Sequence, residues 1–195
     1  MSPHSQRAAA ADISAKGRRT AAWIIALIVF NLAAGNAQSQ KELEYKLKAV
    51  YLFNFLQFSE WPDSAFTDPR APIILGVVGN DPFGTVLDEV VQSEKVGVHP
   101  ITVVRFRTED EITKCQVLFV CLSEKDNCQT ILNGVQGSPT LTVSEINGFD
   151  SLGGCIGFYF EHNRLRFEIN MKALKQARLK MSSKLLRLAR IINPS

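Results

Sequence analysis

The sequence Cys115-Gln116-Val117-Leu118-Phe119-Val120-Cys121 decides the fold of this 195-residue chain. Its side chains alternate with a period of two, so Cys115, Val117, Phe119 and Cys121 are expected to point one way, and Leu118 and Val120 the other. Both sets are apolar, which is typical of a strand that is buried on both faces. Such a strand needs a neighbouring strand at each edge and helices above and below. The stretch therefore predicts a layered α/β domain.

Segments on both sides of this strand predict alternating helices and strands. Before it, the patterns predict a helix over residues 41–58, a strand over 73–78, a helix over about 83–91 and a strand over 101–106. After it, a helix capped by Ser123 and a strand over residues 140–143 are expected. Asp81 is the expected N-cap of the 83–91 helix. This order implies parallel pairing through right-handed crossovers.

The C-terminal segment predicts a β-hairpin followed by two short helices. Strands over residues 155–160 and 165–170 flank a polar turn. In the second strand, Leu165, Phe167 and Ile169 are expected to face inward, and Arg166 and Glu168 outward. Asn170 is the expected cap of one helix, and Ser182 or Ser183 of a last helix with Leu185, Leu188, Ala189 and Ile192 on one face. The fold class is α/β: a single domain with a mostly parallel central sheet flanked by helices, and a C-terminal antiparallel hairpin.

The first 37 residues have the pattern of a secretory signal peptide. Basic residues precede an apolar run over residues 21–34, and Gly35-Asn36-Ala37 follows it. The apolar run is shorter than the ~20 residues that cross a bilayer as a helix. We expect cleavage after Ala37, which leaves one domain over residues 38–195. An uncleaved membrane anchor is the alternative.

Charge is distributed unevenly along the remaining chain. Residues 38–160 contain nine basic and sixteen acidic side chains, whereas residues 161–195 contain nine basic and two acidic ones. The predicted mature domain is therefore formally neutral, and its composition gives no indication of nucleic-acid binding. The basic C-terminal segment is either an electrostatic binding surface or the solvated outer face of two terminal helices.

Four cysteines remain after the expected cleavage, and an even number in an exported protein favours disulfides. On one straight strand, Cys115 and Cys121 would be about 20 Å apart, too far to bridge. Two connectivities remain, of which Cys121–Cys128 with Cys115–Cys155 is preferred. No Cys-x-x-Cys pair is present, so neither a metal site nor a thioredoxin-like redox site is expected.

No arrangement of residues predicts catalysis. The Gly-x-Ser-x-Gly motif of hydrolases with a Ser/His/Asp triad is absent. His99 and His162 have no nucleophile next to them in the sequence. The turn from Gly79 to Gly84 follows a strand and precedes a helix, but it lacks a complete phosphate-binding motif. We therefore expect a non-enzymatic protein without a cofactor.

Six segments, in order, resemble the YfiR-like periplasmic repressors of membrane-bound diguanylate cyclases. They are KLKAVYLFNFLQFSEWP (residues 46–62), LGVVGNDPFG (75–84), residues 115–120, Leu141-Thr142-Val143 followed by Gly153-Gly154, LRFEIN (165–170) and LKMSSKLLRLA (179–189). The resemblance covers nearly the whole predicted mature chain.

The resemblance implies a periplasmic, self-associating α/β protein, a homodimer, that binds the periplasmic part of an inner-membrane GGDEF-type cyclase and holds it inactive. An outer-membrane lipoprotein is implied as the factor that relieves the repression. The family's partner surface lies around the last hairpin and the following helix, which points to Glu168, Phe158 and Leu174 as partner-binding residues. A periplasmic small-molecule sensor that uses the Gly79–Gly84 turn or a cleft between strands is the alternative function.

Overall fold

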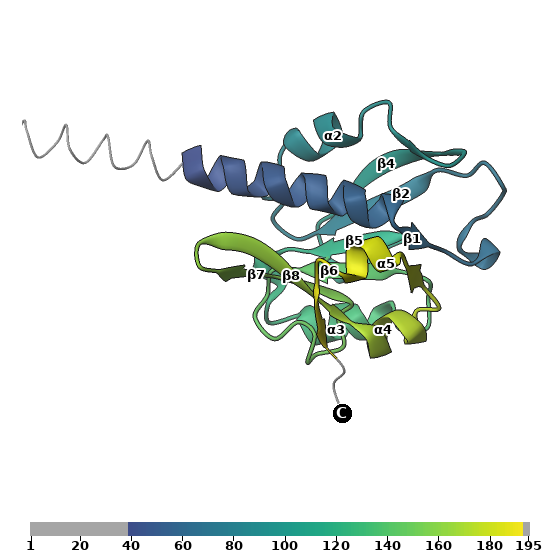
Figure 1. Ribbon diagram of the computed structural model, residues 1–195. Coiled ribbons are helices and arrows are strands. Elements are labelled where there is room, and N and C mark those ends of the chain that lie inside the picture. Colours follow the sequence, from purple (N-terminus) through teal and green to yellow (C-terminus); the bar gives the residue numbers. More distant parts are fainter. Residues whose placement is uncertain (1–38, 193–195) are drawn as a thin grey trace, which may run out of the picture. The chain divides into compact units, whose positions relative to one another are not determined.

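The computed structural model describes residues 39–192 (Figure 1). The chain divides between Leu43 and Glu44 into two units, and the α/β domain is the unit that begins at Glu44. The predicted signal peptide, residues 1–37, lies outside the described residues. Within the described part of the chain, none of the helices has the length and hydropathy of a transmembrane span.

An eight-stranded mixed sheet forms the centre of the domain. In spatial order its strands are β10 (Arg190–Ile192), β8 (Arg164–Asn170), β7 (Ile156–Glu161), β6 (Leu141–Ser144), β5 (Val117–Val120), β2 (Ile73–Val78), β4 (His99–Phe106) and β3 (Lys95–Val96). The strands from β4 to β7 are parallel, and β7 and β8 form an antiparallel hairpin. A separate two-stranded sheet joins β1 (Ser59–Glu60) to β9 (Lys180–Met181). The predicted fold class is confirmed.

Strand β5 lies in the middle of this sheet, as its apolar sequence predicts. It pairs with β2 on one edge and β6 on the other, and all of its residues are buried. Val117 and Phe119 belong to one cluster of buried residues, which we call the first core cluster. Leu118 and Val120 belong to the second core cluster. Alternate side chains of a strand face opposite sides of a sheet, so the two clusters cover its two faces.

Helices supply the other side of each core cluster. The helices of the domain are residues 44–57 of the N-terminal helix, α2 (Val86–Val91), α3 (Cys128–Gly134), α4 (Met171–Gln176) and α5 (Ser183–Leu186), with 3-10 turns η1 (Asp63–Ala65), η2 (Glu109–Glu111) and η3 (Leu122–Glu124). Leu52 and Leu87 place the N-terminal helix and α2 on the first cluster. Ile131 places α3 on the second, and Figure 1 shows α2 and α3 on opposite sides of the sheet.

Two predicted helix starts differ from the structure. Asp81 accepts a hydrogen bond from the backbone N–H of Phe83 at 2.7 Å, but this bond closes a turn, and α2 begins only at Val86. Ser123 does not cap α3, which begins at Cys128. Its hydroxyl oxygen instead accepts from the N–H of Asn80 at 2.9 Å and ties two loops together.

The last described residues form a strand and do not continue a helix. Asn170 caps α4 and Ser182 caps α5, as predicted, because each side chain accepts a hydrogen bond from a nearby backbone N–H. However, α5 ends at Leu186, and residues 190–192 form β10, which runs parallel to β8. Pairing with the otherwise open edge of β8 satisfies backbone groups of both strands. The predicted helical face is also incomplete, because Leu188 is 67% exposed.

Candidate functional site

The outer face of β7, β8 and β10 surrounds Glu168, the principal residue of the predicted partner surface. In the hairpin, Gly157 lies opposite Glu168 and Tyr159 lies opposite Arg166. On the other edge of β8, Arg190 is the register partner of Glu168. Cross-strand partners share one side of a sheet. We call these five residues the hairpin face.

Glu168 is buried, which corrects the expectation that its side chain points outward into solvent. Only 8% of the residue is exposed. Its Oε2 atom accepts a hydrogen bond from Nε of Arg190 at 3.0 Å and also forms an ion pair with Nη2 of the same side chain. The sequence pattern does not predict this ion pair, because the last predicted helix extends to Ile192 and includes Arg190. Glu168 therefore lies between two neighbouring strands instead of at an exposed rim.

Gly157 and Tyr159 hold this ion pair in place. A Cβ atom at Gly157 would lie 3.2 Å from Oε1 of Glu168, so glycine leaves the room that the glutamate occupies. The Arg190 guanidinium carbon lies 4.1 Å from the centre of the Tyr159 ring, a cation–π contact. The hydrogen bond to Glu168 raises the pKa of Arg190. The hairpin face thus presents a fixed guanidinium, whose side chain is 55% exposed, above a covered carboxylate.

The other two predicted partner-binding residues lie in the core. Phe158 is 5% exposed and Leu174 is 2% exposed, and both belong to the first core cluster. The Phe158 ring stacks on Phe55 with the ring centres 5.8 Å apart and also contacts Tyr51. In this conformation Phe158 fixes the hairpin to the N-terminal helix, and Leu174 fixes α4. Neither side chain offers a contact area to a partner.

A buried lysine that sequence reasoning missed links the N-terminal helix to the loop after β6. Lys48 is 1% exposed, and its Nζ lies 2.6 Å from Oε2 of Glu145 and also pairs with Glu44. The Tyr45 hydroxyl donates to Oε1 of Glu145 at 2.9 Å. Burial and the Glu145 carboxylate raise the pKa of Tyr45. The sequence signal for the burial of Lys48 is its position, because it shares a helix face with the buried Leu52 four residues later.

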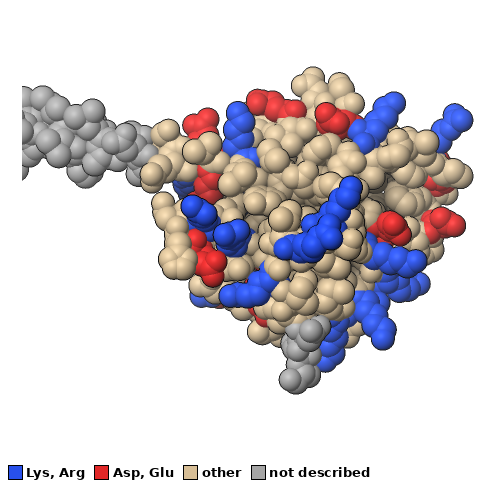
Figure 2. Space-filling model, viewed as in Figure 1, with Lys and Arg blue, Asp and Glu red and all other residues tan. Residues whose placement is uncertain are grey.

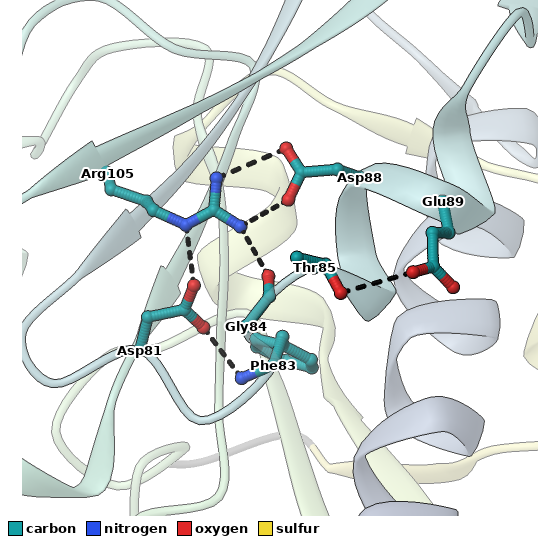
Figure 3. A network of polar contacts seen from close by, with 7 residues as sticks. All are labelled: Asp81, Phe83, Gly84, Thr85, Asp88, Glu89 and Arg105. Carbon is teal, nitrogen blue, oxygen red and sulfur yellow. Dashed lines mark hydrogen bonds and ion pairs between the residues drawn. The ribbon is translucent and has the colours of Figure 1, made fainter.

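Arg105 forms a third polar cluster at the end of β4 (Figure 3). Its Nε donates to Oδ2 of Asp81 at 2.6 Å, its Nη1 donates to Oδ1 of Asp88 at 3.2 Å, and its Nη2 donates to the backbone oxygen of Gly84 at 2.7 Å. The bidentate contact with Asp88 joins β4 to α2. The cluster therefore fixes the turn between β2 and α2, and these contacts use four of the five N–H groups of the guanidinium.

The Arg105 cluster makes stability depend on pH. Hydrogen bonding to Arg105 lowers the pKa of Asp88. A carboxyl with a lowered folded-state pKa contributes stability above its unfolded-state pKa of about 4, and this contribution is lost as pH falls through the folded-state pKa. We expect Arg105→Gln to reduce the loss of unfolding free energy on acidification by about 0.5 kcal/mol. The value is small because half of the Asp88 side chain is exposed. Urea unfolding between pH 5 and pH 2 measures it, and parallel curves for wild type and variant would contradict the assignment.

The Gly79–Gly84 turn, one of the two sites of the alternative sensor function, packs against the loop after β5. Gly79 has a φ of +96°, which favours glycine, and an added Cβ would lie 2.5 Å from Oγ of Ser123 and 2.6 Å from Oε1 of Glu124. The loop after β5 thus fills the space outside the ends of β2 and β5. In α/β sheets this is the usual ligand crevice, and here side chains of the domain occupy it.

A pocket of about 550 Å³ lies instead at the opposite, amino-terminal edge of β5 and β6. Its apolar wall includes Ile131 and Val135 of the α3 region. Charged residues Asp110, Lys114 and Arg178 also line it. The volume lies in the range of small-molecule sites.

All four cysteines are free and buried. Cys121 and Cys155 lie in the first core cluster, and Cys115 and Cys128 lie in the second. The preferred disulfides Cys121–Cys128 and Cys115–Cys155 are absent, and each would have to join residues from different clusters. Cys115 is predicted to share the face of Val117, but β5 begins only at Val117, and Cys115, two residues earlier, belongs to the second core cluster.

We expect four alkylated cysteines in denaturant without reductant, and none in the native protein over the same time. The thiolate is the reactive species, and burial raises the pKa of Cys115 and of Cys121 to about 12. Burial also raises the pKa of Cys128 and of Cys155. Intact-mass spectrometry measures the number of adducts. Protein that remains unmodified in denaturant would show that two disulfides form after all.

Metal binding has no support in residues 39–192, where no group of three or more His, Cys, Asp and Glu side chains could hold an ion. The fold is a single α/β domain whose C-terminal hairpin and β10 carry the polar residues of the hairpin face. A comparison of the sequence with protein families matches residues 45–190 to the family described as YfiR/HmsC-like. The chain belongs to this family, whose members are periplasmic regulators of diguanylate cyclases and not enzymes.

Comparisons with individual proteins cover curated proteins and solved structures. No curated protein matches the chain. Among solved structures, the chain is similar to the ABC domain in complex with L-Trp from Streptococcus pneumonia, with 11% identity, a TM-score of 0.47 and coverage of 62% of this chain and 55% of that one. A conserved domain protein from Vibrio cholerae gives 10% identity, a TM-score of 0.47 and coverage of 62% and 54%. The chain thus spans about half the length of each of these structures.

Proposed function

We propose that this protein represses an inner-membrane diguanylate cyclase by direct contact with the periplasmic part of that enzyme. The family match over residues 45–190 carries the proposal. The domain acts as a binding protein, and cyclic-di-GMP synthesis is the reaction that it controls. Self-association as a homodimer and release of the repression by an outer-membrane lipoprotein belong to the same proposal.

The hairpin face is the proposed contact surface. Arg190 offers donors to a carboxylate or backbone carbonyl of the partner, and Tyr159 offers the edge of an aromatic ring; both residue types are enriched at the centres of interfaces. Glu168 acts by holding Arg190, through the ion pair between adjacent strands. Phe158 and Leu174 contribute indirectly, because their packing in the first core cluster holds the hairpin and α4 in position.

Deletion of the gene tests this function in the source organism. We expect the cellular cyclic-di-GMP level and surface attachment to rise, and both to return to normal when the wild-type gene is restored. A gene that encodes Glu168→Lys should not restore them, because a lysine beside Arg190 replaces attraction with repulsion. An unchanged cyclic-di-GMP level after deletion would refute the proposed repression.

A small-molecule sensor is the second candidate, and the 550 Å³ pocket favours it. Its mixed apolar and charged lining suits a small polar metabolite with an apolar part. A thermal-shift screen of such metabolites, repeated with Val135→Trp to fill the pocket, tests this function. Stabilisation of the wild type alone supports a ligand site, whereas equal shifts in both proteins place the binding elsewhere.

A further inference from the structure

The segment from α4 to α5 carries an uninterrupted run of positive charge. Between residues 171 and 189 there are six basic side chains and no acidic one. They are Lys172, Lys175, Arg178, Lys180, Lys184 and Arg187, and all six are exposed. We call these six residues the basic patch. Figure 2 shows blue side chains gathered where Figure 1 places α4 and α5.

The basic patch is not neutralised within the described part of the chain. No carboxylate lies within ion-pair distance of any of the six side chains, as far as residues 39–192 show. Glu60 is the backbone register partner of Lys180, but the two side chains form no ion pair. The nearby Glu168 is occupied by Arg190. Among the described residues, the only side-chain hydrogen bond of the patch runs from Nη2 of Arg178 to the backbone oxygen of Gly137, at 3.1 Å.

Exposed apolar side chains continue from the basic patch. Leu188 follows Arg187 and is 67% exposed, and Ile191 is 42% exposed. Basic residues next to exposed aliphatic side chains are the composition of an interfacial membrane-binding surface, because the cations attract lipid phosphates while the aliphatic groups enter the headgroup region. An acidic protein is the other partner that such a surface suits, and the vesicle assay distinguishes the two because it contains no protein partner.

We propose that the basic patch, with Leu188, docks the domain on the surface of an anionic phospholipid bilayer. The ammonium and guanidinium groups contact headgroup phosphates, and Leu188 enters the interface. The six basic residues are not members of the hairpin face, and the proposal does not depend on the identity of any protein partner. Held at a membrane, the domain would meet a membrane-bound partner at an increased effective concentration.

Vesicle binding tests the proposal. The protein purified from the periplasm of an expressing cell is sedimented with vesicles of phosphatidylcholine that contain 30% phosphatidylglycerol, or none. Each Lys or Arg near an anionic surface changes affinity by roughly fivefold. We therefore expect the triple variant Lys172→Gln/Lys175→Gln/Lys184→Gln to bind anionic vesicles on the order of 100-fold more weakly. Binding of the wild type should also weaken as salt is raised.

A matched variant separates location from net charge. Arg70→Gln/Arg107→Gln/Lys125→Gln removes the same charge from exposed positions outside the patch, so it should bind like the wild type. Leu188→Ala should weaken binding without changing its salt dependence. The absence of wild-type binding to anionic vesicles, or equal losses in the two triple variants, would overturn the proposal. Neither result would bear on repression of the cyclase, because the assay contains no protein partner.

Discussion

Lys48→Met is expected to destabilise the domain by about 3 kcal/mol, as removal of one partner from a buried ion pair does. The methionine keeps the volume of the apolar stem but leaves the Glu145 carboxylate, whose side chain is only 15% exposed, without its cation. The Tyr45 hydroxyl still donates to Glu145, so part of the compensation remains. Urea unfolding at pH 7 measures the change in the free energy of unfolding.

A second substitution distinguishes lost charge compensation from lost packing. Lys48→Met/Glu145→Gln should recover part of the loss, because the variant no longer buries an unpaired carboxylate. Lys46→Met is the matched control, since Lys46 lies on the same helix and is exposed. A Lys48→Met protein as stable as the Lys46→Met protein would show that the buried cluster contributes nothing.

Phe119→Ala is expected to cost about 3–5 kcal/mol, in the range of large-to-small changes at buried aromatic residues. Phe119 is fully buried in the central strand, and its ring meets that of Phe83 edge to face with the centres 4.8 Å apart. The alanine leaves a cavity beneath both the N-terminal helix and α2. Thermal unfolding and urea unfolding both report the loss.

Phe160→Ala is the control for this core substitution. Phe160 lies on the hairpin and is 53% exposed, so its replacement should change the free energy of unfolding by less than about 0.5 kcal/mol. Comparable losses in the two variants would mean that β5 is not the centre of the core. This result would remove the basis of the fold assignment.

The sheet could be predicted because its strands have strong local patterns. Residues 73–78 are an apolar run between turn residues, and the structure places β2 at the same six positions. The hairpin alternates in both strands around His162 and Asn163, which adopt the positive φ angles of its turn. A strand can be predicted from the sequence where its own residues show which of its faces is apolar.

The polar pairs could not be predicted in the same way because they depend on contacts between distant segments. Glu168 is buried only because β10, a strand of three residues, adds to the edge of β8. Nothing in Arg190-Ile191-Ile192 marks so short a strand. Cys115 joined the second core cluster because its strand begins two residues later than expected. Cys115 therefore lies outside the strand, where the alternation that predicted its side no longer applies, and the disulfide pairing that rested on it does not form.

Affinity capture of the periplasm-expressed protein from detergent-solubilised membranes tests the proposed function most directly. Mass spectrometry of the retained proteins should identify a transmembrane GGDEF protein with the wild type, and at least about tenfold less of it with Glu168→Lys. Glu94→Lys is the control, because it reverses a charge at an exposed position outside the hairpin; circular dichroism melting verifies that both variants fold. Failure to retain a GGDEF protein, or equal retention by the wild type and Glu168→Lys, would contradict repression through the hairpin face.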